Sequence, residues 1–315
     1  MQFQILYKIH LIWFNHKFKK TMSINIKLIE KSGVQLFTIM GLLNDFKKSM
    51  QIISSIGYKN IELFGPYPFS SDKTKKEWSS YKEMFGLKKD DIFDGKNSKE
   101  IYKIIKDNDL NVPSLHIDLN TLRYNFSQLL NEVKHFNSRY IVLPALMDPP
   151  KTIDGYKKCA EEFNSFGKKL SEIDMKFVYH NHGYEHKVID NKEGMSVLFD
   201  YTNPEYVKFE LDVFWMKAAG KNPLEYLKKY PSRFALMHVK DSSEPFVFSK
   251  DGQTPDQWME GFSFVSDPGD GILPLKEYIS EGLKNGIDYF MIEKDLSQDP
   301  IKTLETSYDF LKNFQ

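Results

Sequence analysis

Short apolar runs recur along almost the whole chain, and this repetition limits the fold more than any other feature of the sequence. Most runs are rich in β-branched or aromatic residues and are bounded by charged or turn-forming residues, as expected for strands. Several are continuously apolar, which is typical of strands buried on both faces. The eight runs are VQLFTI (34–39), NIELF (60–64), VPSLHIDL (112–119), YIVLPAL (140–146), KFVYHNH (176–182), VKFELDVFW (207–215), FALMHVK (234–240) and YFMIEKD (289–295).

The segments between these runs have the apolar spacing of amphipathic helices. After residue 43, Phe46, Met50 and Ile53 fall on one helical face, and Gly57 is a good signal for the end of the helix. The same pattern recurs at residues 98–110, 223–230 and 299–314. Strands that alternate with helices in this way predict one parallel (β/α)8 barrel domain over residues 30–315. An open doubly wound sheet is the alternative, which is weakened because no G-x-G-x-x-G follows the first strand.

Residues 1–29 differ from the rest of the chain because they contain no acidic residue. Their longest apolar stretch before a polar residue is LIWF (11–14). A signal peptide needs roughly 7–15 apolar residues, and a membrane span needs about 20. We therefore expect residues 1–29 to be an extension outside the barrel domain, with Met22 just before the globular pattern, and we predict a cytoplasmic protein.

The overall charge gives no support for a polyanionic partner. The chain has 43 basic and 43 acidic residues, so we expect neither nucleic acid nor a membrane surface as a partner. The single cysteine, Cys159, excludes a disulfide within the chain and falls in a helical pattern. We leave homo-oligomerisation open.

Polar residues in the later part of the runs are mainly titratable or metal-binding. In a (β/α)8 barrel the C-terminal ends of the strands form the mouth where the chemistry takes place. Random surface polarity would not favour these residue types so consistently. The residues are Glu62, His116, Asp118, His180, Asn181, His182, Glu210, Asp212, His238, Lys240, Glu293 and Asp295.

Four of these residues, His180, Asp212, His238 and Glu293, come from the fifth to the eighth runs and would meet at one mouth. We predict that they hold one divalent ion, because two imidazoles and two carboxylates suit Mn²⁺, Co²⁺, Fe²⁺, Zn²⁺ or Ni²⁺ better than Ca²⁺. Mg²⁺ is also left open. Each residue alone has a simpler reading: a loop cap for His180, a helix N-cap for Asp212, and a lysine ion pair for Glu293.

We expect Glu62, His116, His182 and Lys240 to contact a substrate, because they lie at the same predicted mouth. For Glu62 an ion pair with a nearby lysine is the competing interpretation. His135 and His186 lie outside the strand ends, and we expect both on the surface.

Several stretches resemble one known family. GYKNIELFG, FVYHNHGYEH, the segment from VKFELDVFW to HVKD, and IEKDLSQDPIKTLETSYDFLKN are similar to the sugar phosphate isomerase/epimerase group of the xylose isomerase-like TIM barrels. The likeness runs from about residue 34 to residue 314. It implies a divalent ion held by Glu, Asp, His and Glu at strand ends, and Asp212, His238 and Glu293 match the last three of these positions.

The first position departs from that family, since His180 stands where the family often has a glutamate that acts as an acid or base. His182 or Glu185 could take the place instead. The resemblance implies a sugar isomerase or epimerase in which Glu293, with His180 as second group, moves a proton next to a carbonyl through an enediolate. Because of the histidine, a lyase or dehydratase of keto-sugars or 3-keto-glycosides is the alternative.

Two further classes share the barrel. A nuclease of the endonuclease IV type needs more metal ligands and a basic surface, which the neutral charge does not favour. A non-catalytic sugar-binding barrel would keep aromatic walls and Lys240 but lose the metal ligands, and all four candidate ligands are present.

Overall fold

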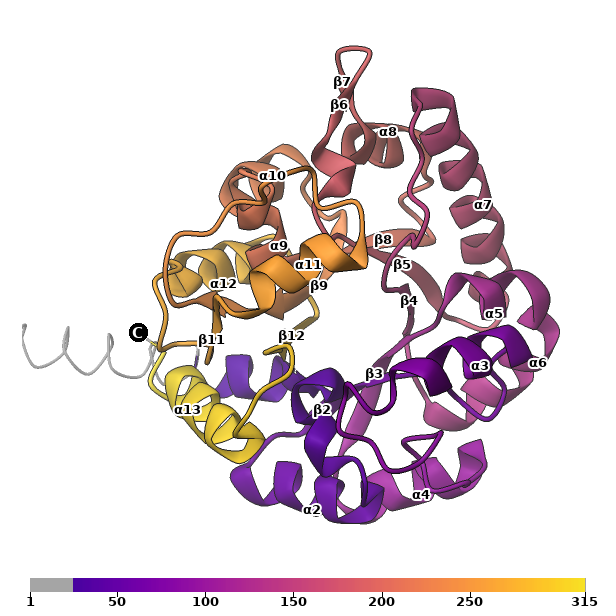
Figure 1. Cartoon of the computed structure of the whole chain (residues 1–315), viewed down its shortest axis with the longest axis vertical. Coiled ribbons are helices and arrows are strands. Elements are labelled where there is room, and N and C mark those ends of the chain that lie inside the picture. The colour runs from indigo at the N-terminus through magenta and orange to yellow at the C-terminus, as the bar shows by residue number, and fades with distance from the viewer. Residues whose placement is uncertain (1–24, 315) are drawn as a thin grey trace, which may run out of the picture.

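The computed structural model describes residues 25–314, and its centre is a closed barrel of parallel strands surrounded by helices (Figure 1). Going round the barrel, the strand order is β1, β12, β9, β8, β5, β4, β3 and β2. This confirms the predicted (β/α)8 barrel. The strands are β1 (Ser32–Gln35), β2 (Asn60–Phe64), β3 (Asn111–His116), β4 (Tyr140–Leu143), β5 (Lys176–His180), β8 (Val207–Asp212), β9 (Phe234–Val239) and β12 (Tyr289–Ile292).

Each predicted run overlaps one of these strands, but several runs continue beyond the strand. The largest difference is at the first run, where the strand ends at Gln35 and a 3-10 helix, η1 (Leu36–Leu42), follows. In the sixth run the chain turns into α9 directly after Asp212. The strand and the helix that follows it are both rich in apolar residues, so composition alone does not indicate where the strand ends.

The helices lie outside the strands. They are α2 (Phe46–Ile56), α3 (Asp72–Tyr81), α4 (Ser98–Asp107), α5 (Leu119–Tyr124), α6 (Phe126–Val133), α7 (Ile153–Ser171), α8 (Gly194–Tyr201), α9 (Val213–Ala218), α10 (Pro223–Lys229), α11 (Pro255–Phe262), α12 (Leu275–Lys284) and α13 (Pro300–Lys312). Short 3-10 helices are η2 (Lys134–Phe136) and η3 (Tyr184–His186), and β6 (Val188–Ile189) with β7 (Lys192–Glu193) and β10 (Asp241–Ser242) with β11 (Val265–Ser266) form two small antiparallel pairs. In the described residues no helix is long and apolar enough to cross a membrane.

Helix α2 illustrates how the local sequence sets these elements. Asp45 caps its start by accepting a hydrogen bond from the backbone N–H of Lys48. Phe46, Met50 and Ile53 are buried, as their spacing predicts. The helix ends at Gly57, whose φ of 121° suits glycine.

The packed part of the chain begins before residue 30. Residues 25–31 are helical, Leu28 is fully buried in the core, and the side chain of Asn25 donates a hydrogen bond to the carbonyl of Lys312. The predicted boundary after residue 29 is therefore too late. Residues 1–24 lie outside the described part, so the expectation that they form an extension outside the barrel stays a prediction.

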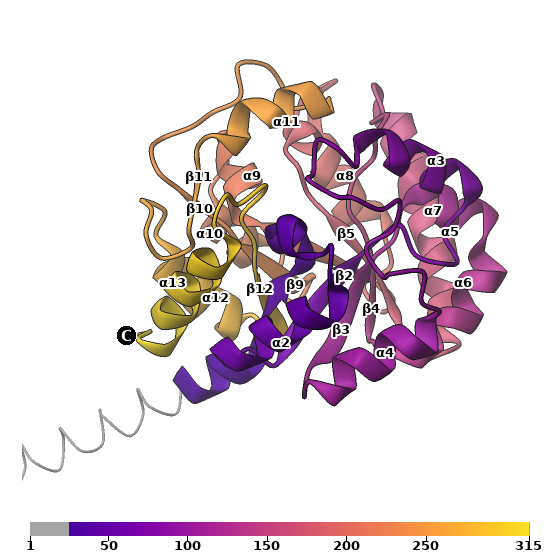
Figure 2. The ribbon, with the colours of Figure 1, turned by 60° about the horizontal axis from the view of Figure 1, so that its bottom comes forward.

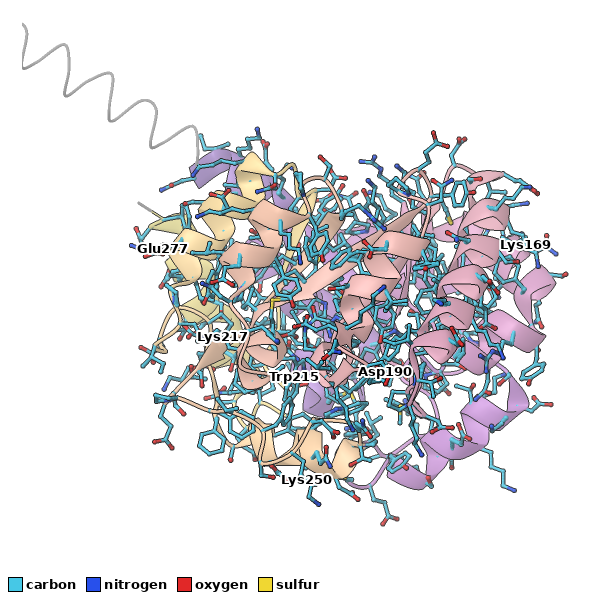
Figure 3. The ribbon with its side chains drawn as sticks, turned by 90° about the horizontal axis from the view of Figure 1, so that it is seen from above. Lys169, Asp190, Trp215, Lys217, Lys250 and Glu277 are labelled. Atoms are coloured by element: carbon cyan, nitrogen blue, oxygen red, sulfur yellow. The ribbon has the colours of Figure 1, made fainter. Side chains whose placement is uncertain are left out.

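Side chains inside the barrel change from apolar to polar along the strands. Successive residues of a strand point to opposite faces, so residues two apart share the interior. Val178 is followed two positions later by His180, and Leu236 by His238, and all four are buried. Apolar residues thus fill the lower interior, where Val178 and Leu236 belong to one cluster, and polar residues fill the end at which the strands stop. Larger apolar side chains pack between sheet and helices, where Trp215 lies inside while Lys169 and Glu277 lie at the periphery (Figure 3).

Loops that follow the strand ends cover this polar end. Helix α11 belongs to the connection after β9, and α3 to the connection after β2, and both lie at the same end of the barrel in Figure 2. These segments therefore partly cover the strand ends, and the polar side chains there are largely buried.

A polar cluster joins the β6–β7 hairpin to the helices beside it. The Glu193 carboxylate accepts hydrogen bonds from the Lys221 ammonium and the Tyr226 hydroxyl. His186 lies 3.1 Å from that hydroxyl and is only 4% exposed, so its predicted surface position is wrong. No local sequence pattern indicates these partners, because they come from separate elements.

We expect Glu193→Gln to lower the free energy of unfolding at pH 7 by about 1 kcal/mol. Burial would raise the pKa of Glu193, but hydrogen bonds from His186, Lys221 and Tyr226 outweigh it and lower that pKa to about 2. A lowered carboxyl pKa gives stability that is present above pH 4.5 and is lost as the pH falls towards 2. Thermal melts of both proteins should therefore differ at pH 7 and converge below pH 4.5. An equal difference at all pH values would contradict this role.

Candidate active site and metal centre

The structure brings the four predicted metal ligands to one end of the barrel. His180 and Asp212 end β5 and β8, His238 is the penultimate residue of β9, and Glu293 follows β12. The Nδ1 atom of His238 lies 2.6 Å from Oε2 of Glu293 and 3.9 Å from Oδ2 of Asp212. The Nε2 atom of His180 lies 3.7 Å from the same Asp212 oxygen. Ligand atoms of Asp212, His238 and Glu293 all lie within 4.8 Å of one another.

Asp212 has two different oxygens. Its Oδ1 accepts a hydrogen bond from the backbone N–H of Trp215 and so caps α9, which agrees with the simpler interpretation of this residue. Its Oδ2 is buried and has no hydrogen-bond partner. Burial raises the pKa of Asp212 to about 6, although Lys240 opposes this shift. A buried oxygen that accepts no hydrogen bond, with the Lys240 ammonium 3.2 Å away and two imidazoles and a second carboxylate nearby, fits a divalent ion with mixed nitrogen and oxygen ligands.

Lys240 brings an ammonium group to this end of the barrel. Its Nζ lies 2.9 Å from Glu293 Oε2, 2.9 Å from Asp295 Oδ2 and 3.2 Å from Asp212 Oδ2. The ammonium also lies over the ring of Trp215, 5.1 Å from its centre. The expected pair between Glu293 and a lysine is therefore present. Of the cluster residues, Glu293 and Asp295 are 5% and 8% exposed, so they lie on the side nearer to solvent.

Two further carboxylates lie deeper and are fully buried. Glu62 Oε2 is 2.6 Å from His238 Nε2 and 3.1 Å from His116 Nε2, and it accepts a hydrogen bond from Gln35. Glu210 Oε2 is 3.0 Å from both His116 Nε2 and His180 Nδ1. The ligand atoms of His116, His180, Glu210 and His238 form a second group within 4.8 Å of one another.

These contacts differ from the expectations for Glu62. Its partners in the described residues are imidazoles and an amide, not a lysine, so the ion-pair interpretation is wrong. Its side chain is fully buried, which favours support of His238 over contact with a substrate. His116 is 8% exposed and keeps a position at the mouth.

The HNH segment after β5 is held by Glu185. The Glu185 carboxylate accepts hydrogen bonds from the Tyr179 hydroxyl and from the backbone N–H groups of His182 and Gly183. These contacts use both of its oxygens, so Glu185 serves the loop and is a poor candidate for the first metal ligand. The ring of His182 packs 4.4 Å from Trp258 of α11, and its Nδ1 has no partner.

Burial and charge separate the protonation states of the histidines. Burial lowers the pKa of His180 well below its usual range. Burial and the Lys240 ammonium lower the pKa of His182 to about 3. Burial would also lower the pKa of His116, but Glu62 and its neighbouring carboxylate outweigh it and raise that pKa to about 9. His180 and His182 are therefore neutral at pH 7. Burial would lower the pKa of His238 too, but Glu210, Glu293 and Glu62 outweigh it and raise that pKa, so His238 would have to lose a proton to bind an ion.

Glu210 and Asp295 are in the site, but the sequence analysis gave them no role. A signal for Glu210 was available, because it precedes Asp212 by two positions and therefore shares its face of β8. Asp295 likewise follows Glu293 by two positions. The sequence does not show how far along the barrel axis each side chain lies. That position decides whether a residue lies beneath the site or faces it.

Known proteins with similar sequences can be aligned with about half of this chain. An inosose dehydratase of Clostridium tetani is 26% identical over 161 residues, which are 51% of this chain and 53% of that protein. Inosose dehydratase 2 of Bacillus cereus is 29% identical over 157 residues, 48% of this chain and 50% of that protein. The chain thus spans about half the length of the curated relatives it matches.

Solved structures match over most of the chain. A sugar phosphate isomerase/epimerase of Parabacteroides distasonis has a TM-score of 0.69 at 21% identity, with 90% of this chain and 94% of that chain covered. The probable 3-DHS dehydratase AsbF of Bacillus anthracis has a TM-score of 0.64 at 13% identity, with 90% and 100% covered. The IOLI protein with a bound zinc atom has a TM-score of 0.64 at 17% identity, with 90% and 96% covered. At these identities the likeness concerns the fold.

The family follows from a match over most of the sequence. Residues 50–314 match the family described as xylose isomerase-like TIM barrel. That range contains seven of the eight barrel strands and all four candidate ligands. The resemblance found in the sequence is thereby confirmed, and the chain belongs to the xylose isomerase-like TIM barrel family.

Proposed function

We propose that this protein is a divalent-metal-dependent lyase that removes water from a keto-sugar or keto-cyclitol. The observation that carries this proposal is the group formed by Asp212, His238 and Glu293, with His180 Nε2 at 3.7 Å from Asp212 Oδ2 and Lys240 beside Glu293. Support for a dehydratase comes from relatives that are inosose dehydratases. The isomerase or epimerase that we expected first has support only from likeness of fold. The lyase alternative is therefore preferred.

The proposed ligands are His180, Asp212, His238 and Glu293. An ion bound there would stabilise the negative charge that develops on a substrate oxygen when the neighbouring C–H loses its proton. Zinc in the similarly folded IOLI protein is compatible with this donor set, and the identity of the ion stays open among Mn²⁺, Co²⁺, Fe²⁺, Zn²⁺ and Mg²⁺.

Glu293 is the proposed base. Its carboxylate is ionised, because His238 and Lys240 lower its pKa more than burial raises it. It accepts the proton from the carbon next to the carbonyl, and the resulting enolate then forms a carbon–carbon double bond as the hydroxyl on the next carbon departs. The proton that Glu293 accepted leaves with that hydroxyl as water. Lys240 donates a hydrogen bond from Nζ to the departing oxygen.

Three other groups would bind the substrate hydroxyls. His116 and Lys240 offer donors at the mouth, and neutral His182 offers an unpaired Nδ1 against the ring of Trp258. Trp215 and Trp258 pack against the ring of His182 and hold it in place.

The reaction is tested by incubating metal-loaded protein with keto-cyclitols, keto-sugars and 3-keto-glycosides in D₂O, followed by NMR. We expect an unsaturated ketone and water from one of these substrates, with no activity after chelation. An intact isomer that carries deuterium would instead support the isomerase. The absence of both elimination and exchange in metal-loaded protein would contradict the lyase.

We expect Lys240→Met to reduce kcat about 100-fold, because a donor to the departing oxygen is lost. Metal affinity should stay the same or rise, since a cation next to the ligands is removed. Lys294→Met is the matched control, because Lys294 is adjacent to Glu293 in sequence but pairs with Asp267. Steady-state kinetics and metal titration of both variants check this. Equal kcat values for wild type and Lys240→Met would contradict the role.

A further inference from the structure

We propose that Glu62 and Glu210 are positioning residues that make His238 and His180 present opposite ring nitrogens to the ion. His238 would bind through Nδ1 and His180 through Nε2. This inference rests on the metal site of the proposed function and adds which carboxylate orients each histidine.

The contacts of His238 assign its two nitrogens to different neighbours. Its Nδ1 faces Glu293 Oε2 at 2.6 Å and Asp212 Oδ2 at 3.9 Å, which are proposed ligand oxygens. Its Nε2 faces Glu62 Oε2 at 2.6 Å and Glu210 Oε1 at 3.2 Å. Carboxylate oxygens lie 2.6 Å from both nitrogens, but an ion held by Glu293 and Asp212 would take the place of a proton on Nδ1, so the one N–H of the bound imidazole would be on Nε2, facing Glu62. The lone pair is thereby left on Nδ1.

The contacts of His180 are reversed. Its Nδ1 lies 3.0 Å from Glu210 Oε2, and its Nε2 lies 3.7 Å from Asp212 Oδ2. Glu210 therefore keeps the proton on Nδ1 and leaves the lone pair of Nε2 towards Asp212. The difference follows from strand position, because Glu210 and Asp212 lie two residues apart on the inner face of β8, one below the other.

The depth of the two carboxylates excludes direct contact with a substrate. Both side chains are 0% exposed, whereas the side chain of His116 is 9% exposed. His116 Nε2 lies between them, at 3.1 Å from Glu62 and 3.0 Å from Glu210, and its ring stacks on that of His238. Buried carboxylates are costly without partners, and most of their partners here are imidazoles. Partners of this kind fix the tautomer and the orientation of metal-binding histidines.

The main test is the metal affinity of Glu62→Gln and Glu210→Gln, measured by zinc competition against a chromophoric chelator. Glutamine keeps the shape but presents a weaker acceptor, and we expect each variant to bind zinc about 10- to 100-fold more weakly than wild type. Glu193→Gln is the matched control, because Glu193 also contacts a histidine, His186 at 3.6 Å, but outside the proposed metal site. Its metal affinity should equal that of wild type.

The number of bound zinc ions distinguishes this positioning role from direct metal binding by the second group, which is formed by His116, His180, Glu210 and His238. The amount of zinc at saturation should be one per chain in wild type and in both variants. Two zinc ions in wild type and one in Glu210→Gln would mean that Glu210 holds a second ion, which would overturn the positioning role. Unchanged affinity in both variants would also overturn it.

NMR of ¹⁵N-histidine-labelled wild-type protein loaded with zinc reads the tautomers directly and does not depend on the folding of a variant. We expect the N–H of His238 at Nε2 and that of His180 at Nδ1. Zinc binding with the same tautomer at both residues, or with the reverse assignment, contradicts this inference alone. Wild-type protein that binds no ion contradicts the proposed metal site as well.

Discussion

Replacing Asp212 with asparagine should weaken metal binding by more than about 100-fold while the barrel stays folded. Even partners of metal ligands contribute 10- to 100-fold to affinity, so the loss of a ligand charge should cost more. Asparagine caps helices as well as aspartate does, so the hydrogen bond from the Trp215 N–H to this side chain can be kept. The substitution thus distinguishes the metal-binding role of Asp212 from its role as a helix cap. Elemental analysis after dialysis and circular dichroism are the measurements.

Asp299→Asn is the control for this experiment. Asp299 caps α13 by accepting a hydrogen bond from the Lys302 N–H and is remote in sequence from the proposed ligands. It should retain the wild-type metal content. Full metal occupancy in Asp212→Asn would exclude Asp212 from the ligand set.

Replacing Glu293 with glutamine should reduce turnover about 100- to 10,000-fold at saturating metal, because the amide cannot accept the substrate proton. Saturating metal is needed because Glu293 is also a proposed ligand. Loss of α-proton exchange with D₂O, at a rate measured by NMR, is the direct readout. Glu277→Gln serves as the control, since Glu277 lies exposed at the periphery on α12 (Figure 3). Unchanged exchange in Glu293→Gln would mean that another group is the base.

Much of the fold could be predicted from the sequence because barrel strands are continuous in the chain. NIELF became β2 with the predicted bounds, and Phe46, Met50 and Ile53 face the core as their spacing indicates. Strand ends were harder to predict, because Leu36–Leu42 is as apolar as a strand but forms a 3-10 helix. The start of the packed chain was also placed too late, since one buried side chain, Leu28, is not a periodic signal.

The sequence could predict which residues point towards the site, but not how deep in the barrel each of them lies. Residues at strand ends of a barrel must converge, so His180, Asp212, His238 and Glu293 could be grouped without coordinates. The sequence did not distinguish Glu62, which lies beneath His238, from residues that face the mouth. That distinction depends on the stagger of the strands, which no local pattern records.

The position of the bound ion tests the account most directly. A crystal of the zinc-loaded protein, measured at the zinc absorption edge, should show one anomalous peak. We expect it at about 2.0–2.2 Å from His180 Nε2, His238 Nδ1, Asp212 and Glu293. A peak among His116, Glu210 and Glu62, or no peak inside the barrel, would contradict the assignment of this site.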